Sequence, residues 1–311
     1  MSTVRVAAVQ AAPVFLDKHA STDKACALIK QASEGGANLV AFSETWLPGY
    51  PRWVNAPLGA GEKRRLTGLY LDASITIGGP ETDRLCAAAR ESNVDVVMGI
   101  AELDPVTQGS TYATLLFIGS DGEILGRHRK IKPTSGERTA WADGDAVGLR
   151  VHRRPYGVLS GLNCWEHNMV LPGYALMAEG TQIHVAAFPG YDGVGTRQLL
   201  LSRAFASQGA CYVILVGGVL RPTDVPDNVD AGLRAAVATL PDFTGDSYII
   251  DPYGEIVAGP GVDEEILFAD IDLDMVRKAK ALTDIGGHYS RPDLLRLVIN
   301  RNPVQRVIED Q

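Results

Sequence analysis

The sequence predicts an α/β fold, a four-layer α-β-β-α sandwich in which two stacked sheets are covered by helices. Apolar runs of strand length recur between longer segments with helical periodicity. The two halves of the chain also repeat one order of strand, helix, strand and hairpin. No linker rich in Ser, Pro or Gly separates them, so we expect a single domain over residues 1–311, with a C-terminal extension from about residue 272.

The predicted strands are apolar runs bounded by polar or turn-forming residues. They cover residues 4–12, 38–42, 94–100, 113–118, 157–162, 182–187, 212–216, 246–250 and 265–270. Residues 120–123 and 251–255 each contain a glycine and lie between two apolar runs, which is typical of β-hairpins.

The predicted helices follow from apolar residues that recur on one helical face. They cover residues 18–33, 82–92 and 197–209, with a further apolar helix around residues 171–177. Two segments, residues 192–196 and 221–240, are expected to form a surface loop or flap. The second of them mixes Pro, Asp, Asn and Gly with small apolar residues.

Composition and charge exclude several classes of protein. The net charge is −8 and the pI is about 5.3, which disfavours a surface that binds nucleic acid. No apolar run reaches the roughly 18 residues of a membrane span. Gln10 and Pro13 interrupt the apolar N-terminus, so a core strand explains it better than a targeting signal. The four cysteines are widely spaced, which is typical of a reduced protein and predicts a cytoplasmic location.

Cys164 is the first candidate for chemistry. It follows the apolar run 157–162, where a buried strand should end, and α/β proteins place reactive side chains at such ends. A thiol is nucleophilic only as the thiolate, so Cys164 needs an activating partner. Taken alone, a core position explains it equally well, and core positions explain Cys26, Cys86 and Cys211 better.

Two charged residues at other strand ends are candidate partners. Glu44 follows the run 38–42, and a carboxylate desolvated in an apolar pocket suits a general base. Lys130 could stay charged beside a carboxylate and stabilise an anionic intermediate. Taken alone, Glu44 could cap a turn, and Lys130 could lie on a solvated strand face with Lys132 on the same side.

Glu166 and His167 flank Cys164, which raises the possibility of a Cys–His pair or a metal site. Neighbours in sequence do not point the same way, and the chain has no H-E-x-x-H motif or paired Cys/His spacing. We therefore expect no metal.

Three sequence blocks carry a family resemblance: FSETWLPGYP at residues 42–51, HRKIKPT at 128–134 and NCWEHNM at 163–169. In order and spacing they resemble the nitrilase branch of the carbon–nitrogen hydrolase superfamily. The Trp-Glu pair after Cys164 is typical of that branch and is usually missing from the amidases. The resemblance extends from residues 4–10 to residues 287–293.

The resemblance implies the sandwich fold of the carbon–nitrogen hydrolase type and an enzyme that hydrolyses an organic nitrile to a carboxylic acid and ammonia. It implies that Cys164 is the nucleophile, Glu44 the base and Lys130 the electrostatic stabiliser. Glu137 matches a second glutamate, which orders the lysine or assists proton transfer. The resemblance also implies that neither a metal nor a cofactor is used.

Aromatic residues near the predicted strand ends could line a substrate pocket, although ordinary packing also explains them. The candidates for substrate binding are Trp165, Tyr50, Trp53 and Phe188. The aromatic-rich segment 44–53 favours an aryl-aliphatic nitrile over cyanide itself.

Several alternatives stay open at this stage. A cyanide hydratase or dihydratase, or an amidase, would use the same scaffold. A non-catalytic interaction protein would need none of Glu44, Lys130 and Cys164. A redox-sensing thiol would need a resolving cysteine or an exposed site, and nothing marks Cys26, Cys86 or Cys211 as a resolving cysteine. The resemblance further implies a homo-oligomer, a dimer or larger, with the apolar helix at residues 171–177 and the C-terminal segment as candidate surfaces.

Overall fold

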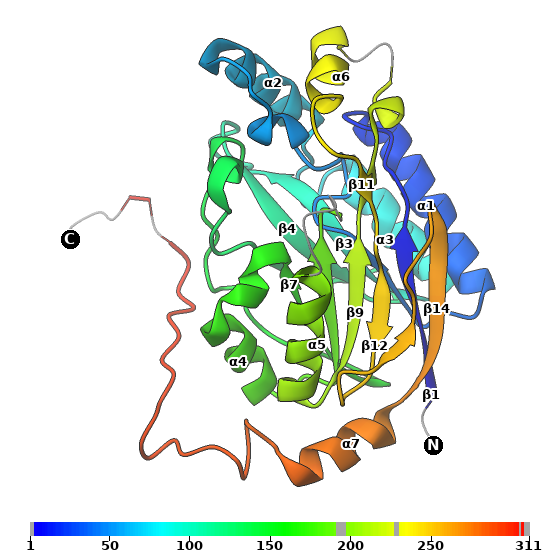
Figure 1. The fold of residues 1–311 in the computed structure, drawn as a ribbon, viewed down its shortest axis with the longest axis vertical. Coiled ribbons are helices and arrows are strands. Elements are labelled where there is room, and N and C mark those ends of the chain that lie inside the picture. The colour runs from blue at the N-terminus through cyan, green and yellow to red at the C-terminus, as the bar shows by residue number, and fades with distance from the viewer. Residues whose placement is uncertain (1–2, 191–196, 227–229, 305, 308–311) are drawn as a thin grey trace.

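The computed structural model describes residues 3–190, 197–226, 230–304 and 306–307. Within these residues, two six-stranded sheets stack face to face, and helices cover the outer face of each sheet (Figure 1). The predicted α-β-β-α sandwich is therefore confirmed.

The first sheet contains most of the N-terminal strands and one strand from near the C-terminus. Its order is β14-β1-β2-β3-β4-β5, with β1, β2 and β3 parallel to one another. The strands are β1 (Thr3–Gln10), β2 (Leu39–Phe42), β3 (Asp95–Leu103), β4 (Thr111–Ile118), β5 (Ile124–Arg129) and β14 (Glu265–Asp272).

The second sheet has the same number of strands and a parallel centre. Its order is β13-β12-β9-β8-β7-β6, with β7, β8 and β9 parallel. The strands are β6 (His152–Arg154), β7 (Gly157–Asn163), β8 (Ile183–Phe188), β9 (Tyr212–Gly217), β12 (Tyr248–Ile250) and β13 (Ile256–Ala258). In each sheet, parallel strands end at the same edge, and this brings residues from different strand ends together.

Side chains of successive strand residues point to opposite faces, so each strand serves two layers of the core. In β1, Val4 and Val6 pack between the two sheets, whereas Ala7 and Val9 pack under α1 (Lys18–Glu34) and α3 (Pro80–Ser92). On the other side of the molecule, α4 (Val170–Ala178) and α5 (Arg197–Gly209) cover the second sheet. Strands buried on both faces explain the nearly continuous apolar runs of the sequence.

Both predicted hairpins are present. The turn between β4 and β5 closes with a 2.8 Å hydrogen bond from the Gly119 N–H to the Glu123 carbonyl, and Gly122 has a φ of +82°. The turn between β12 and β13 has Gly254 at a φ of +84°. Glycine adopts such positive φ angles without the strain that a side chain would add.

The prediction of a loop over residues 221–240 is wrong for part of that segment. Helix α6 (Ala231–Val237) begins at Asp230, whose side chain accepts the Leu233 N–H, and it buries Leu233, Ala236 and Val237. That i, i+3, i+4 spacing is the signal of a short amphipathic helix, which the surrounding Pro, Asp, Asn and Gly residues obscured. The other predicted loop, residues 192–196, lies outside the described residues.

The remaining elements are short or peripheral: the helices α2 (Ala60–Ala73) and α7 (Leu273–Leu282), the 3₁₀ turns η1 (Arg52–Asn55), η2 (Ser135–Thr139), η3 (Cys164–Asn168) and η4 (Pro222–Asp224), and the strands β10 (Val219–Leu220) and β11 (Phe243–Thr244). Of these, η1, η2 and η3 carry candidate site residues. None of the described helices is long and apolar enough to cross a membrane.

Candidate active site

The structure brings the predicted site residues together from separate segments. Glu44 lies two residues beyond β2, Lys130 directly follows β5, and Cys164 directly follows β7. Each of these side chains is at most 2% exposed. Glu44 and Lys130 therefore come from the first sheet and Cys164 from the second, and they meet where the strand ends of the two sheets converge.

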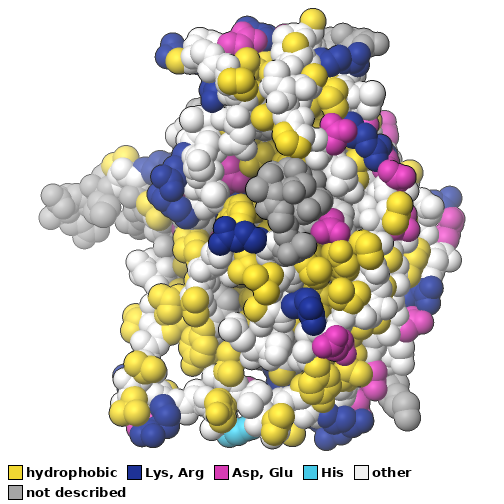
Figure 2. Space-filling view, viewed as in Figure 1, with side chains coloured by type: hydrophobic (Ala, Val, Ile, Leu, Met, Phe, Trp, Pro, Cys, Tyr) yellow, Lys and Arg dark blue, Asp and Glu magenta, His cyan; other side chains and the backbone are white. Residues whose placement is uncertain are grey.

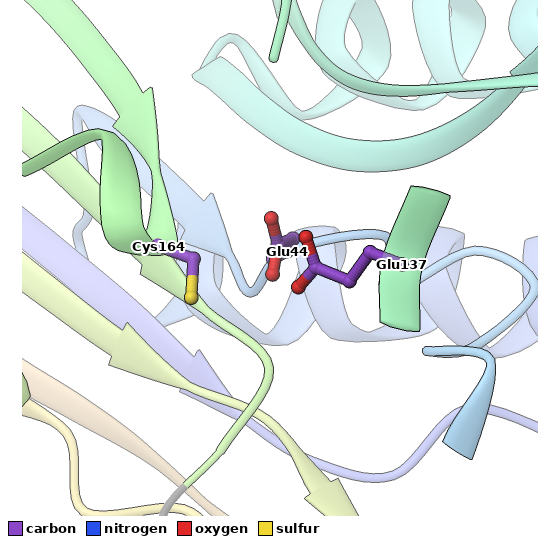
Figure 3. Close-up of side chains that lie close together, drawn as sticks. All are labelled: Glu44, Glu137 and Cys164. Atoms are coloured by element: carbon purple, nitrogen blue, oxygen red, sulfur yellow. The ribbon is translucent and has the colours of Figure 1, made fainter. Parts of the chain in front are cut away.

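Lys130 is the centre of the charged network. Its Nζ donates hydrogen bonds of 2.8 Å to Glu44 Oε1 and 2.7 Å to Glu137 Oε2. A carboxylate oxygen of Glu44, a carboxylate oxygen of Glu137 and Cys164 Sγ all lie within 4.8 Å of one another. Figure 3 shows these three side chains pointing toward a common space. The arrangement places an acceptor, a cation and a thiol within reach of one small molecule.

Glu137 is held by its own turn. It lies in η2, where its Oε2 accepts the Thr134 N–H at 2.6 Å while the Thr134 side chain caps the same turn. Its Oε1 accepts a 2.8 Å hydrogen bond from the Tyr50 hydroxyl. This reciprocal capping box satisfies backbone donors and fixes the carboxylate in one orientation toward Lys130.

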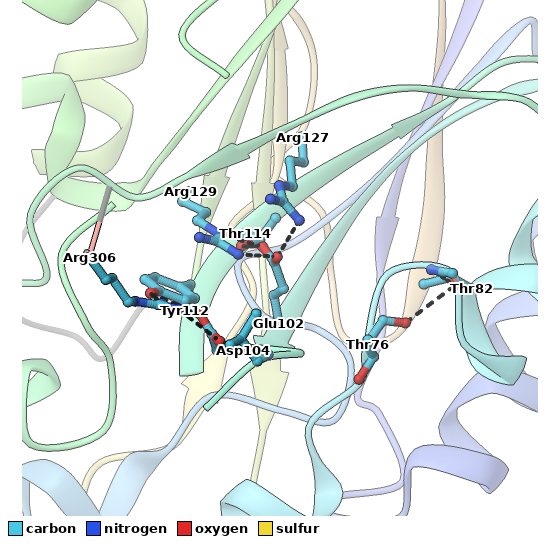
Figure 4. A network of polar contacts seen from close by, with 11 residues as sticks. Thr76, Thr82, Glu102, Asp104, Tyr112, Thr114, Arg127, Arg129 and Arg306 are labelled. Atoms are coloured by element: carbon cyan, nitrogen blue, oxygen red, sulfur yellow. Dashed lines mark hydrogen bonds and ion pairs between the residues drawn. The ribbon is translucent and has the colours of Figure 1, made fainter. Parts of the chain in front are cut away.

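The strand that leads into Lys130 is anchored by a second ionic network. Glu102 on β3 is 1% exposed and receives hydrogen bonds from Arg127 at 2.5 Å, from Arg129 at 2.9 Å and from Thr114 at 2.8 Å (Figure 4). Arg127 and Arg129 lie on the same face of β5, as strand alternation requires. The network fixes the end of β5 and therefore the backbone from which Lys130 extends.

The alternative in which Lys130 and Lys132 share a solvated strand face does not hold. Lys130 is buried, whereas the Lys132 side chain is half exposed and pairs with Asp143 at 2.6 Å. Strand β5 ends at Arg129, so strand alternation does not continue to these two residues.

Burial controls the protonation of the candidate base. It raises the pKa of Glu44 from 4.5 to about 8, against the lowering effect of the Lys130 charge. Burial alone would lower the pKa of Lys130, but Glu44, Cys164 and Glu137 raise it above its ordinary value. Glu44 Oε2 has no hydrogen-bond partner among the described residues. A buried carboxylate with one free oxygen and a pKa near neutrality suits proton transfer.

Cys164 has the geometry of a positioned nucleophile. It opens η3 with a φ of +45°, a left-handed conformation that is costly for a residue with a side chain and is concentrated at functional sites. Burial raises the pKa of its thiol well above the ordinary value, and Glu44 raises it further. Lys130 and the backbone N–H of Trp165 lower it. The thiol therefore needs a base to become a thiolate.

Comparison with known proteins shows the family to which this chain belongs. The family model described as carbon-nitrogen hydrolase matches residues 5–281. The chain belongs to the carbon–nitrogen hydrolase family. It is 50% identical over 307 residues to Nitrilase 2 from an unknown prokaryotic organism, covering 98% of this chain and 95% of that protein. It is 38% identical to an aliphatic nitrilase of Rhodococcus rhodochrous, covering 96% of this chain and 83% of that protein.

A solved structure of a carbon-nitrogen hydrolase has a similar fold. A crystal structure of a carbon-nitrogen hydrolase from Helicobacter pylori G27 matches with a TM-score of 0.72 at 18% identity, covering 90% of this chain and 93% of that one. The family and the fold type inferred from the three sequence blocks are therefore confirmed. The predicted single domain with an extension from about residue 272 stays a prediction.

Three of the four aromatic residues predicted to bind substrate in this carbon–nitrogen hydrolase contact residues in or beside the site. Tyr50 donates a hydrogen bond to Glu137, and Trp165, which is half-buried, follows Cys164 and carries the Arg197 guanidinium 5.1 Å from its ring centre. Phe188 ends β8 and stacks on His167 at a ring separation of 5.3 Å.

Trp53 lies in a different environment from the other three. It is 0% exposed and packs against Phe15 and Tyr70, with ring separations of 6.4 Å and 5.3 Å. These contacts are those of a core residue, and its role in substrate binding stays a prediction.

No role is assigned from the sequence to two residues of the site region: His128 is not singled out, and Glu166 is considered only as a neighbour of Cys164. His128 and Glu166 are fully buried and paired, with His128 Nε2 3.0 Å from both carboxylate oxygens. The signal was present, because His128 belongs to the HRKIKPT block and Glu166 to NCWEHNM, but a buried ion pair between two blocks cannot be seen from either block alone. Trp141 also lies beside the site, because its ring centre is 5.4 Å from Lys130 Nζ.

Glu44, Glu137 and Cys164 are of types that bind metal ions, and their ligand atoms lie close together. The Lys130 ammonium group bonds to both carboxylates and supplies the positive charge that would otherwise come from a cation. This arrangement suits proton transfer and anion stabilisation by the protein's own side chains.

Proposed function

We propose that this carbon–nitrogen hydrolase is a nitrilase, which hydrolyses an organic nitrile to the carboxylic acid and ammonia. The observation that carries the proposal is the buried set of Glu44, Lys130, Glu137 and Cys164, in a chain 50% identical to a nitrilase over 98% of its length. In this proposal Cys164 is the nucleophile, Glu44 the general base and Lys130 the electrostatic stabiliser. Glu137 orients Lys130.

The first step forms a covalent bond between the enzyme and the nitrile carbon. Glu44 removes the thiol proton of Cys164, and the sulfur adds to the carbon of the C≡N group. One electron pair of the triple bond moves to nitrogen, which takes up the proton, and the product is a thioimidate. Lys130 and the Trp165 N–H, which both stabilise negative charge at Cys164, are placed to stabilise the developing charge.

Two waters complete the reaction. Glu44 removes a proton from the first water, whose oxygen adds to the thioimidate carbon and gives a tetrahedral intermediate. Protonation of nitrogen and cleavage of the carbon–nitrogen bond release ammonia and leave a thioester. A second water then adds to the thioester, the carbon–sulfur bond breaks, and the carboxylic acid leaves with the thiol restored.

A competing outcome follows from the same intermediate. If the carbon–sulfur bond of the tetrahedral intermediate breaks before the carbon–nitrogen bond, the product is the amide. A nitrilase and a nitrile-hydrating enzyme therefore differ in which bond breaks first. The amidase and the cyanide-acting enzymes are the alternatives on this scaffold, and product analysis separates them.

The substrate-binding residues belong to the same proposal. Trp165 and Phe188 follow or end strands of the second sheet beside Cys164, which supports their placement at the pocket wall. Tyr50 and Trp53 are retained as pocket candidates, with the contacts of Tyr50 supporting an effect through Glu137. The net charge of −8 supports a small organic nitrile as the partner rather than nucleic acid.

We also propose a homo-oligomer and a cytoplasmic location. Val170 and Leu171 on α4 and Leu200 on α5 are 79%, 62% and 64% exposed, and hydrophobic side chains are visible on this face in Figure 2. Clustered exposed apolar residues are typical of interaction surfaces. All four cysteines are free thiols, which supports a reducing compartment. Light scattering of the purified protein tests the assembly.

Ammonia release from a panel of substrates tests the function. The panel contains phenylacetonitrile, mandelonitrile, benzonitrile, fumaronitrile, an aliphatic nitrile, cyanide and phenylacetamide, with Cys164→Ala as the control. Ammonia and acid from a nitrile, abolished by Cys164→Ala, are the expected result. Turnover of phenylacetamide alone would assign the protein to the amidases, and ammonia from no member of the panel would contradict the proposal.

A further inference from the structure

Glu166 is a buried carboxylate for which the proposed mechanism has no use. It lies in η3, two residues after Cys164, and is 1% exposed. Taking such a group out of water is costly unless its oxygens are hydrogen-bonded. All of its polar contacts among the described residues are directed to two segments, the turn that carries Cys164 and the end of β5 that carries Lys130.

The two oxygens of Glu166 bind the backbone beside each reactive residue. Oε1 accepts the Ile131 N–H at 2.8 Å, and Ile131 directly follows Lys130. Oε2 accepts the Asn163 N–H at 2.8 Å, and Asn163 directly precedes Cys164. One carboxylate therefore joins the two sheets at the point where Lys130 and Cys164 leave them.

His128 completes this connection. It lies on β5, is 1% exposed, and its Nε2 is 3.0 Å from both oxygens of Glu166. Burial alone would raise the pKa of Glu166, but His128 and the Ile131 and Asn163 N–H groups hold it below its ordinary value. The carboxylate is thus ionised and receives hydrogen bonds from three donors.

We propose that Glu166 and His128 are a positioning pair, which sets the separation of Cys164 Sγ from Lys130 Nζ and Glu44 by fastening η3 to the end of β5. The inference rests on the proposed function for its catalytic consequence. Neither residue touches the substrate or exchanges a proton with it. Covalent catalysis depends on such placement, because a misplacement of about 1 Å can reduce the rate roughly 100-fold.

Substitutions that change a single hydrogen-bonding group can test this proposal. Glu166→Gln has almost the same shape, but its NH₂ group would face a backbone N–H, since three donors meet at this side chain. His128→Leu removes the donor, whereas His128→Gln retains a donor near the position of Nε2. Glu179→Gln is the matched control, because Glu179 is half-buried, accepts the Val151 N–H at 3.3 Å and pairs with Arg301 at the other end of α4.

Two measurements are made on each full-length variant. The first is kcat and KM for the best nitrile of the panel. The second is the pH midpoint of Cys164 alkylation by iodoacetamide, read by peptide mass spectrometry with the half-buried Cys26 and Cys86 as internal references. Thiolate stability depends on the distances from Cys164 to Lys130 and Glu44, so this midpoint reports the geometry without any nitrile. Circular dichroism gives the folded fraction.

For Glu166→Gln and His128→Leu we expect kcat to fall about 10- to 100-fold with KM nearly unchanged. The Cys164 midpoint should move by about one pH unit, a tenfold change in thiolate fraction. His128→Gln should recover most of kcat, and Glu179→Gln should match the wild type.

Wild-type kcat and midpoint in Glu166→Gln and His128→Leu would overturn the inference, as would a loss of kcat that follows the unfolded fraction alone. If the wild type hydrolyses no nitrile, the proposed function fails, and the alkylation midpoint still decides whether Glu166 and His128 position Cys164.

Discussion

Lys130 Nζ donates a 2.8 Å hydrogen bond to Glu44 Oε1, and both side chains are wholly excluded from solvent. A buried ion pair gains Coulomb energy but loses the hydration of both charges, so it is weak evidence for stability. Here the pair has a chemical consequence. It keeps Lys130 charged beside the thiol while burial keeps the Glu44 pKa near neutrality.

Replacing Glu44, the proposed base, should abolish most of the activity. Glu44→Gln retains the size of the side chain but cannot accept the thiol proton, and general base catalysis contributes about 10²–10⁴-fold. We expect kcat/KM for the preferred nitrile to be reduced by about 10²–10⁴-fold or more. Steady-state ammonia release checks this, with Glu179→Gln as the control. Activity within threefold of the wild type would exclude Glu44 as the base.

The pH dependence of Cys164 reactivity should report Glu44. Because the carboxylate must be ionised to accept a proton, kcat/KM and the alkylation rate of Cys164 should rise with pH around the Glu44 pKa of about 8. In Glu44→Gln that inflection should disappear. A profile identical in both proteins would assign the inflection to another group.

The same shift has a consequence for stability. The folded-state pKa of Glu44 is raised above its ordinary value of 4.5, so the folded state binds the proton more tightly than the unfolded chain does. The contribution of Glu44 to stability is therefore fully present below pH 4.5 and is lost as the pH rises to about 8. Urea denaturation at several pH values measures this effect. Between pH 4.5 and about 8, the free energy of unfolding should decrease less in Glu44→Gln than in the wild type.

Removal of Lys130 should damage both activity and stability. Lys130→Met leaves Glu44 and Glu137 buried side by side without their cation, and breaking a buried ion pair costs about 3–5 kcal/mol. The free energy of unfolding should fall by that amount at pH 8 and by less at pH 5, where the carboxylates can take up protons. Loss of one preorganised charge should also reduce kcat about 10²–10³-fold.

Lys130→Arg tests whether charge alone is sufficient. The planar guanidinium group is larger and distributes its charge differently, so it should not fit between the two carboxylates and should not restore kcat. A fully active Lys130→Arg protein would show that the site needs only a positive charge.

Tyr50→Phe separates two roles for Tyr50. The Tyr50 hydroxyl donates to Glu137 Oε1, and loss of a hydrogen bond to a charged group costs about 1.5–3 kcal/mol. If Tyr50 acts through Glu137, kcat and the free energy of unfolding fall while KM changes little. If Tyr50 instead contacts the substrate directly, KM rises. Initial rates over a range of nitrile concentrations distinguish these outcomes.

Much of the fold could be predicted from local patterns. The strands buried on both faces are nearly continuous apolar runs, and both hairpins carry a glycine that the structure places at positive φ. Helix α6 was missed because Asp230, which caps it, belongs to a stretch whose composition is typical of a loop. The composition of this stretch predicts a loop, whereas the spacing of its apolar residues predicts a short helix. The helix forms because Leu233 and Val237 pack into the core.

A candidate site residue could be predicted only where its own position in the sequence marked it. Cys164, Glu44 and Lys130 each follow a strand, and strand ends can be recognised one at a time. The Glu166–His128 pair depends on how two sheets stack, since its members are 38 residues apart in sequence. For the same reason, the sequence could not assign the Tyr50 hydroxyl to Glu137.

The division of the site between two sheets limits when the thiol can react. A ribosome-bound chain that has just been extended past residue 164 already contains Glu44, Lys130 and Cys164, but β8, β9 and β12 have not yet been synthesised. The thiol gains its base and its cation only when the second sheet is complete and stacks on the first. We therefore expect the Cys164 thiol of an incomplete chain to react like an ordinary cysteine, and to be activated only once the second sheet has formed and packed on the first.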